Sequence, residues 1–356
     1  MNITKPTLLI DKEKCLANIS KMATKASLSK VNFRPHFKTH FSSEIGNWYH
    51  DAGVNSCTVS SVSMADYFIK HGWKDITIAF PFNPLEAATI SELASQASIN
   101  ILIESEESLS LANQLLTSKV SYFIKVDIGT YRTGLDPNNE YLINKLVSGS
   151  TNNVQFKGFL AHAGHTYGES NDIEIKSIFN KSVKTLTSLQ TRFGGLISYG
   201  DTPSCSVMDD FSAFDEIRPG NFIFYDWMQH QIGSCAIENI AVCMACPVVA
   251  IHADRNEVVV YGGGVHISKD RVLEDEAPCF GKAVRLKEDG WDTQIIGSVK
   301  KLSQEHGIIY MSSEELSQVK VGDLIGVIPV HSCLAADLHG HYLTTSGERI
   351  EKMAKD

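Results

Sequence analysis

The chain has 356 residues, enough for one to three domains, and its 43% hydrophobic and 21% charged content is ordinary for a soluble globular protein. A formal net charge of −9 argues against a surface that binds nucleic acid or anionic membranes. No apolar run is long enough to span a bilayer, and residues 1–14 lack the apolar segment of a signal peptide. We therefore expect a cytoplasmic protein with no nucleic-acid partner and no membrane partner.

From residue 7 to about 230, short apolar runs alternate with amphipathic stretches. Helical spacing is clearest over residues 13–25, 63–71, 84–97, 106–117 and 172–192. The strand-like runs are residues 31–33, 57–60, 76–80, 99–103, 122–126, 156–161, 196–198 and 222–224. Eight such β/α alternations predict an α/β fold, a (β/α)8 TIM-type barrel with its helices outside.

After about residue 235 helical periodicity is nearly absent. Strand-like runs at 245–252, 257–261, 293–299 and 323–329 are separated by Gly, Asn and Asp turns, which predicts a second, mainly antiparallel β domain. Residues 7–10 are expected to add a strand to it. The predicted division is a barrel over residues 11–235 and a β domain over residues 236–356. The β domain is also expected to include the N-terminal strand within residues 1–10.

The segment 34–40, RPHFKTH, places Lys38 among Arg34, His36 and His40, after a predicted strand. Cationic neighbours disfavour the charged form of a lysine. A neutral lysine amine is a nucleophile that forms Schiff bases with carbonyl compounds or with pyridoxal phosphate (PLP). The alternative for this segment alone is a surface lysine in a basic loop.

Polar residues gather where the predicted strands end, and in a β/α barrel the active site is built at the C-terminal strand ends. Any one of these residues could be structural, but their shared position predicts a site. Loops 198–204 and 218–222, after strands seven and eight, could hold a phosphate through Gly200, Gly220 and neighbouring N–H groups. The strand-end residues are His36, Lys38, Ser60, Ser61, Asp127, Gly129, Tyr131, Arg132, His162, His165, Tyr167, Tyr199, Gly200, Asp201, Thr202, Tyr225 and Asp226.

Three further motifs are weaker. Residues 262–264, Gly-Gly-Gly, precede no helix-like segment, so a tight turn or close packing is favoured over a phosphate site. Cys243 and Cys246 have the spacing of a redox or zinc pair but lie in an apolar run, which favours core packing. His331 and Cys333 stand two apart beside a strand-like run, and imidazole with thiolate suits zinc. An ordinary buried histidine and cysteine are the alternative there.

Seven segments in this order resemble the D-serine dehydratase and D-threonine aldolase group of fold-type III PLP enzymes, distant relatives of alanine racemase. The resemblance runs over nearly the whole chain and implies an alanine-racemase-like barrel followed by a β domain. The segments are RPHFKTH (34–40), VDIGTYRTGL (126–135), GFLAHAGHTYG (158–168), DTPS (201–204), EIRPGNFIFYD (216–226), EHG (305–307) and HSC (331–333).

The resemblance also implies roles for single residues. Lys38 matches the PLP-bearing lysine, and Arg132 matches an arginine that faces the pyridine nitrogen. His162 and Tyr167 match positions near the cofactor ring. The implied phosphate-loop residues are Thr202, Gly220 and Asn221, and the implied ligands of Zn²⁺, or of another divalent cation, are His331 and Cys333.

The implied function is a lyase that acts on D-β-hydroxy amino acids, with D-serine converted to pyruvate and ammonia. Cys333 favours zinc and dehydration. A D-threonine aldolase-type cleavage to glycine and an aldehyde is the alternative, and an amino-acid racemase or a non-catalytic PLP-binding protein are further alternatives. Val330, where relatives often have asparagine, and the segment 198–201, SYGD, less glycine-rich than usual, leave the substrate open. The resemblance also implies a homodimer.

Overall fold

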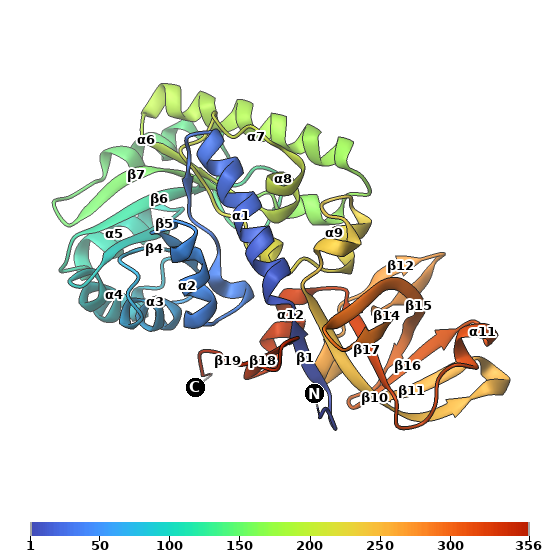
Figure 1. The fold of residues 1–356 in the computed structure, drawn as a ribbon. Coiled ribbons are helices and arrows are strands. Elements are labelled where there is room, and N and C mark those ends of the chain that lie inside the picture. Colours follow the sequence, from blue (N-terminus) through green and yellow to red (C-terminus); the bar gives the residue numbers. More distant parts are fainter. Residues whose placement is uncertain (1, 355–356) are drawn as a thin grey trace. The chain divides into compact units, whose positions relative to one another are not determined.

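The computed structural model describes residues 2–354 (Figure 1). The chain divides into two compact units. The barrel unit comprises Ser20–Lys38 and Ile45–Gly220, and the β unit comprises the segment up to Ile19, Thr39–Glu44 and the chain from Asn221 onward. Over the described range, no helix has the length and apolar character needed to cross a membrane.

The barrel unit contains eight strands, and every neighbouring pair is parallel. A parallel bridge between His36 and Thr58 joins the two edges of this sheet, where the Thr58 N–H donates to the Pro35 carbonyl at 2.8 Å. The expected TIM-type barrel is therefore confirmed. In sheet order its strands are β2 (Asn32–Phe33), β9 (Glu216–Ile217), β8 (Leu196–Tyr199), β7 (Val154–Ala161), β6 (Val120–Val126), β5 (Ser98–Ile103), β4 (Asp75–Pro81) and β3 (Cys57–Val59).

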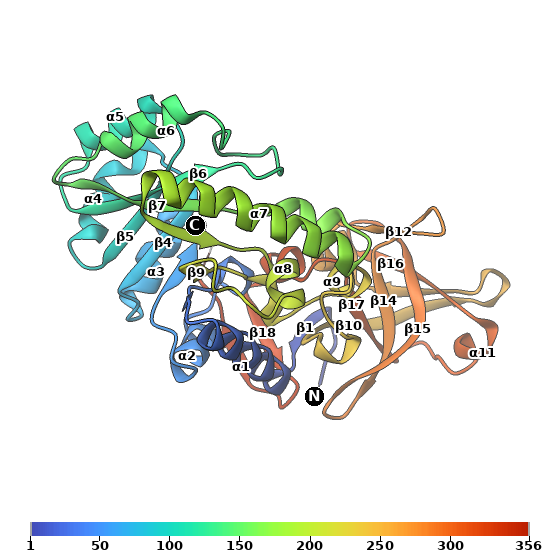
Figure 2. The same ribbon diagram turned by 90° about the horizontal axis from the view of Figure 1, so that it is seen from above.

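Helices connect successive barrel strands, and polar residues cap them. Ser61, Ser105 and Asn171 each accept a hydrogen bond from the first turn of the helix that follows. The longest helix, α7, packs on β7 and β8 (Figure 2). Its buried side includes Ile175 and Leu186, as the 3.6-residue spacing predicts. The helices are α1 (Lys12–Leu28), α2 (Ser43–Asp51), α3 (Val62–Lys70), α4 (Ala87–Ala94), α5 (Glu106–Leu115), α6 (Glu140–Ser148), α7 (Asp172–Phe193) and α8 (Thr202–Val207), with 3₁₀ turns η1 (Phe37–Thr39), η2 (Pro84–Glu86) and η3 (Gly164–Gly168).

The eighth strand lies elsewhere than expected. Residues 222–224 do not form it, because Asn221–Ile223 is a 3₁₀ turn, η4. The strand is β9, only two residues long. Its first residue is Glu216, a buried carboxylate, so the strand has no apolar run to mark it in the sequence. The apolar residues 222–224 are equally buried, but in a helical turn.

Arg34 was expected to crowd Lys38, and the structure corrects this. Its guanidinium binds Glu216 and Asp75, each through a contact of 2.8 Å. These two carboxylates are the first residues of β9 and β4, so Arg34 faces the N-terminal ends of the strands. A small buried apolar cluster is formed by Leu102 of β5, Phe123 of β6 and Leu160 of β7, and Ala79 of β4 packs against it.

The β unit is built on a nine-stranded sheet in the order β11-β16-β15-β14-β17-β10-β1-β18-β19. A further pairing of β10 with β11 closes six of these strands into a ring. The strand β1 (Thr7–Ile10) runs antiparallel to β10 and so lies in the sheet of the β unit. The other strands are β10 (Val242–His252), β11 (Glu257–Tyr261), β12 (Val272–Glu274), β13 (Ala277–Cys279), β14 (Gly281–Lys287), β15 (Gly290–Leu302), β16 (His306–Met311), β17 (Leu324–Pro329), β18 (His341–Thr344) and β19 (Arg349–Glu351).

Short helices connect the strands of the β unit. They are α9 (Trp227–Gln231), α10 (Gly264–Ile267), α11 (Ser313–Leu316) and α12 (Ser332–Asp337), with 3₁₀ turns η5 (Ile237–Asn239) and η6 (Ala253–Arg255). Cys243 and Cys246 are fully buried free thiols in β10, as core packing predicts. A Cβ on Gly262 would lie 2.4 Å from the Cys246 sulfur, so the glycine allows close packing there. A helix does follow this glycine run, but α10 is only four residues long.

Candidate functional site

Lys38 lies at the C-terminal end of β2, in the 3₁₀ turn η1, and its side chain is exposed. Its backbone N–H points to the Nδ1 atom of His36 at 3.4 Å. His36 is buried, and its bridge to Thr58 closes the barrel at this position. The structure therefore places an exposed lysine two residues after a buried histidine, just beyond the end of the first barrel strand.

Two histidines at this end of the barrel are neutral. Burial, helped by the positive charges of Lys38 and Arg218, holds the pKa of His36 well below its usual range. Burial lowers the pKa of His162 to about 3, although the bond to Gly200 opposes the shift. That bond joins His162 Nδ1 to the Gly200 carbonyl at 2.7 Å. Because a carbonyl only accepts, Nδ1 carries the proton and Nε2 keeps its lone pair.

Arg132 is exposed on the loop that follows β6. The carboxylate of Asp127 organises this loop by accepting the N–H groups of Gly129, Thr130 and Tyr131 at 2.9–3.0 Å. The Thr130 hydroxyl donates to the His162 carbonyl at 2.8 Å and so ties this loop to the end of β7. Arg132 and His162 therefore belong to one connected group of strand-end loops.

The two expected phosphate loops meet. The Gly220 N–H donates to the Thr202 hydroxyl at 3.3 Å, and the Thr202 N–H points to the Tyr167 hydroxyl at 3.4 Å. A Cβ on Gly200 would lie 2.7 Å from the backbone of Arg218, so only glycine allows this approach. Glycine, threonine and tyrosine from three strand ends thus supply N–H and hydroxyl groups at one place, as an anionic group requires.

Sequence reasoning missed two buried cations at the same strand ends. Arg218 is 4% exposed and donates to the Ser198 hydroxyl and to the Ala161 carbonyl, both at 2.6 Å. Burial lowers the pKa of Arg218 to about 10. Lys125 is 5% exposed, and burial together with Arg218 and Arg132 lowers its pKa to about 8. A basic residue inside a strand-like apolar run, as in YFIKV, was the available signal.

Other predicted strand-end residues have structural roles. Ser61 caps α3, and the Ser60 hydroxyl bonds the sulfur of Met64. Asp201 caps α8 by accepting the Ser204 N–H at 2.6 Å. Asp226, expected at the end of strand eight, caps α9 and belongs to the β unit.

The pair His331 and Cys333 lies at the junction between β17 and α12. His331 is the N-cap residue of α12, and Cys333 is in its first turn. The Thr39 hydroxyl lies 3.3 Å from the Cys333 sulfur. Burial opposes ionisation of the thiol, but hydrogen bonds from His331 and Thr39 outweigh it and lower the pKa of Cys333. Burial would also lower the pKa of His331, but Asp270 and Cys333 raise it above its usual range.

Asn221, expected in the phosphate loop, directs its side chain to this pair. Its Nδ2 atom donates to Asp226 Oδ2 at 2.6 Å, to the Ser332 hydroxyl at 3.0 Å and towards the Cys333 sulfur at 3.6 Å. Asp226 Oδ2 also accepts the Ser332 N–H at 2.9 Å. Hydrogen bonds therefore hold both Ser332, which lies between His331 and Cys333, and the Cys333 thiol.

The donor set fits a zinc ion with open coordination positions. Among residues 2–354 no group of three or more His, Cys, Asp or Glu side chains is arranged to hold a metal. On binding zinc, His331 would release a proton and supply a neutral imidazole nitrogen, and Cys333 would supply a thiolate; zinc prefers both of these ligands. Two protein ligands leave room for water or substrate.

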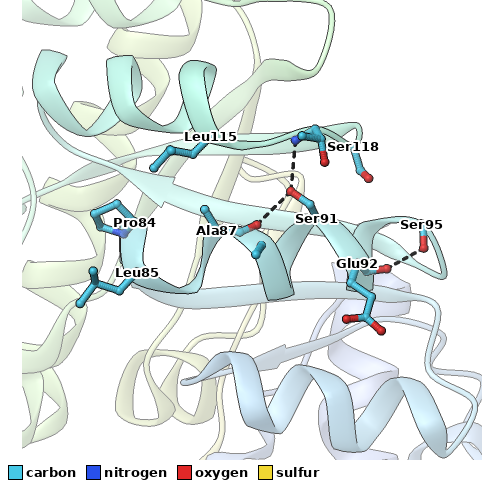
Figure 3. A pocket seen from close by; sticks show the side chains of 10 residues that line it. Pro84, Leu85, Ala87, Ser91, Glu92, Ser95, Leu115 and Ser118 are labelled. Carbon is cyan, nitrogen blue, oxygen red and sulfur yellow. Dashed lines mark hydrogen bonds between the residues drawn. The ribbon is translucent and has the colours of Figure 1, made fainter.

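A groove on the helical layer of the barrel does not contain this chemistry. It lies along α4 and the end of α5, and Leu85 and Leu115 line it (Figure 3). The Ser91 hydroxyl at its floor donates to the Ala87 carbonyl and accepts the Thr117 N–H. Glu92 is the one ionisable residue among the residues that line the groove. The strand-end residues are therefore the better candidate site.

Two family models match the chain. Residues 10–226 match the model described as alanine racemase, N-terminal domain, and residues 241–345 match the one described as putative serine dehydratase domain. A D-serine dehydratase from Dictyostelium discoideum is 29% identical and covers 96% of this chain and 93% of its own length. A D-threonine aldolase from Arthrobacter sp is 24% identical over 62% of this chain and 61% of its own length.

The fold is that of solved alanine-racemase-like structures. The structure of D-threo-3-hydroxyaspartate dehydratase from Delftia sp. HT23 superposes with a TM-score of 0.88 at 21% identity, covering 99% of this chain and 98% of that one. A mutant of a protein of that name has also been solved in a metal-free form.

Proposed function

The chain belongs to the family described as alanine racemase, N-terminal domain, and we propose that it is a PLP- and metal-dependent lyase that acts on D-β-hydroxy amino acids. The favoured reaction is conversion of D-serine to pyruvate and ammonia, by likeness to the D-serine dehydratase above. The observation that supports the proposal is that Lys38, two neutral histidines and two glycine-bearing loops all lie at the C-terminal ends of the barrel strands.

The residues at these strand ends fit PLP. Lys38 would hold it covalently, and the N–H and hydroxyl groups of Thr202 and Gly220 would bind its phosphate. His162 and Tyr167 would flank its ring, and Arg132 would face its pyridine nitrogen. Asn221 would contribute to phosphate binding through its backbone, since Asp226, Ser332 and Cys333 occupy its side-chain amide.

The charges support an anionic cofactor. Besides burial, four groups lower the pKa of His36, and each of them disfavours a further positive charge there. They are Lys38, Arg218, His162 and Arg132. A bound phosphate would offset this repulsion. PLP, when bound, withdraws electrons from the substrate α-carbon. The amine of Lys38 would then accept the proton from that carbon, while the neutral His36 and His162 add no competing charge.

The metal pair supports elimination of a β-hydroxyl. Zinc held by His331 and Cys333 would supply Lewis acidity towards a hydroxyl group. Thr39, whose hydroxyl contacts the Cys333 sulfur, is the residue that follows Lys38 in the chain. Asn221, which also contacts Cys333, follows Gly220 of the phosphate loop. Two residues that directly follow proposed cofactor residues in the chain therefore contact the proposed metal ligand Cys333.

The second candidate is a D-threonine aldolase-type cleavage to glycine and an aldehyde. The D-threonine aldolase match favours it, because the same barrel and cofactor residues can serve either bond cleavage. The Cys333 thiolate favours dehydration, since a soft ligand selects zinc over harder cations.

A substrate panel tests the proposal. Enzyme loaded with PLP and zinc should release pyruvate from D-serine but not from L-serine. A coupled lactate dehydrogenase assay measures the pyruvate. Aldehyde and glycine from D-threonine would favour the aldolase reaction, and the opposite enantiomer would favour a racemase. Absence of all these products, with PLP bound, would contradict a lyase. A homodimeric state and a cytoplasmic location are further proposals, which light scattering and cell fractionation test.

A further inference from the structure

The glycine run 262–264 brings a short segment of the β unit close to its neighbours. A Cβ on Gly263 would lie 2.3 Å from the Gln304 carbonyl oxygen, so the chain passes where only glycine fits. The helix α10 follows, and Ser268, just after it, adopts a left-handed φ of 73°. Asp270 lies two residues after Ser268, at the end of this sequence of turns. We call residues 262–270 the α10 segment.

Two histidines connect the α10 segment to the helix that carries the metal pair. His331, at the start of α12, places Nδ1 2.8 Å from Asp270 Oδ2. His339, just beyond the end of α12, places Nε2 2.9 Å from the His266 carbonyl. His266 in turn lies 3.6 Å from Glu305. The α10 segment is thus joined to both ends of α12.

The Asp270 contact decides which nitrogen of His331 can bind a metal. The carboxylate accepts a hydrogen bond, so Nδ1 carries a proton and Nε2 is left as the ligand atom. A ring held by one fixed hydrogen bond also loses less rotational freedom when it binds a metal. A carboxylate in this position behind a ligating histidine typically changes metal affinity by about 10- to 100-fold when removed.

We propose that Asp270 is a positioning residue for the metal ligand His331, and that the α10 segment exists to hold it there. The inference rests on the proposed function for the role of the metal. The glycine run 262–264 has no role in the proposed catalysis or cofactor binding. Under this inference its role is to allow the close packing that holds Asp270 near His331. The contact partners are few and specific: Asp270 holds His331, while Asp226 holds Ser332 and Thr39 holds Cys333.

Zinc affinity of the PLP-loaded enzyme tests this proposal. Wild type and the variants D270A, D270N, C333A and E305Q are stripped of metal and titrated with zinc against a chromophoric chelator. We expect D270A to weaken zinc binding by about 10- to 100-fold. D270N should lose less, because its amide oxygen still accepts the Nδ1 proton. E305Q is the matched control, since Glu305 contacts His266 in the same segment but not His331, and its zinc affinity should stay at the wild-type value.

Each outcome separates the inference from the proposed function. If C333A weakens zinc binding while D270A does not, Asp270 has no positioning role and the inference is wrong. If C333A leaves zinc binding unchanged, His331 and Cys333 are not the metal site, and both proposals about the metal fail. Equal loss in D270A and E305Q would point to general damage of the segment and would also contradict the inference. Thermal melting and PLP content identify variants that misfold, and D270N then replaces D270A as the test.

Discussion

Arg34 should stabilise the barrel without acting on Lys38. Its side chain is 2% exposed, and it donates to Glu216 and to both carboxylate oxygens of Asp75 at 2.8 Å. Arg34→Met removes the cation that offsets the burial of Glu216, itself 3% exposed. Removing one partner of a buried ion pair costs about 3–5 kcal/mol. We expect the free energy of unfolding of the barrel to fall by about this amount, with turnover per folded molecule unchanged.

The pH dependence of this effect has a definite sign. Burial would raise the pKa of Glu216, but Arg34 and Ser198 outweigh it and lower the pKa. A carboxyl whose folded pKa is depressed stabilises the fold above its unfolded pKa, about 4.3 for glutamate. That contribution is lost as the pH falls through the folded pKa. The difference between wild type and R34M should therefore be largest near neutral pH and should shrink below about pH 4.

Urea unfolding followed by far-UV circular dichroism measures both effects. R192M is the matched control, because Arg192 pairs with Glu140 at a half-exposed surface site and should matter far less. The double variant R34M/E216L, which removes the stranded charge as well, should recover much of the loss. An unchanged urea midpoint combined with lost turnover would refute the ion-pair reasoning and return Arg34 to the neighbourhood of Lys38.

Three further predictions concern the site. Borohydride reduction of the PLP-loaded enzyme should attach the cofactor to Lys38, as peptide mass spectrometry would show, and K38A should lose about 100- to 10,000-fold in turnover; a label on another lysine would contradict this. R132E should change the visible spectrum of the loaded enzyme and the ratio of its products, whereas unchanged spectra would make Arg132 structural. Chelation should abolish elimination yet leave PLP on Lys38, zinc should restore activity better than magnesium, and C333D should shift the metal preference towards harder cations; full activity without metal would exclude this role.

The barrel could be predicted because its signals are local. Apolar runs of three to six residues and helix-length gaps between them identified seven of its strands, and β1 was found in the same way. The eighth strand escaped because β9 is two residues long and begins with Glu216, whose charge is neutralised by Arg34 from a segment 182 positions away. Pairing at that separation depends on the closed barrel itself, and no local pattern of the chain encodes it.

The direction of a side chain was harder to predict than its place in the chain. Lys38, His162 and Gly220 lie at the expected strand ends, and their expected roles remain predictions. Arg34 and Asn221 lie in the expected motifs but face other partners, Glu216 and the Cys333 sulfur. A motif fixes the position of the backbone, whereas a neighbouring charge decides where a long or polar side chain points.

The two cations that sequence reasoning missed strengthen the case for an anionic ligand. Lys125 and Arg218 are buried at strand ends, and burial lowers the pKa of each. The nearby carboxylate of Asp127 is committed to three loop N–H groups. Glu216, which acts on Arg218, also binds Arg34, and buried positive charge that is only partly offset by carboxylates reduces stability. A ligand that brings a phosphate to these strand ends would reduce that penalty, and its stabilisation of the folded state would grow with the logarithm of its concentration over its dissociation constant. If the proposed cofactor binds there, its binding and the stability of the barrel would be coupled through the same buried cations.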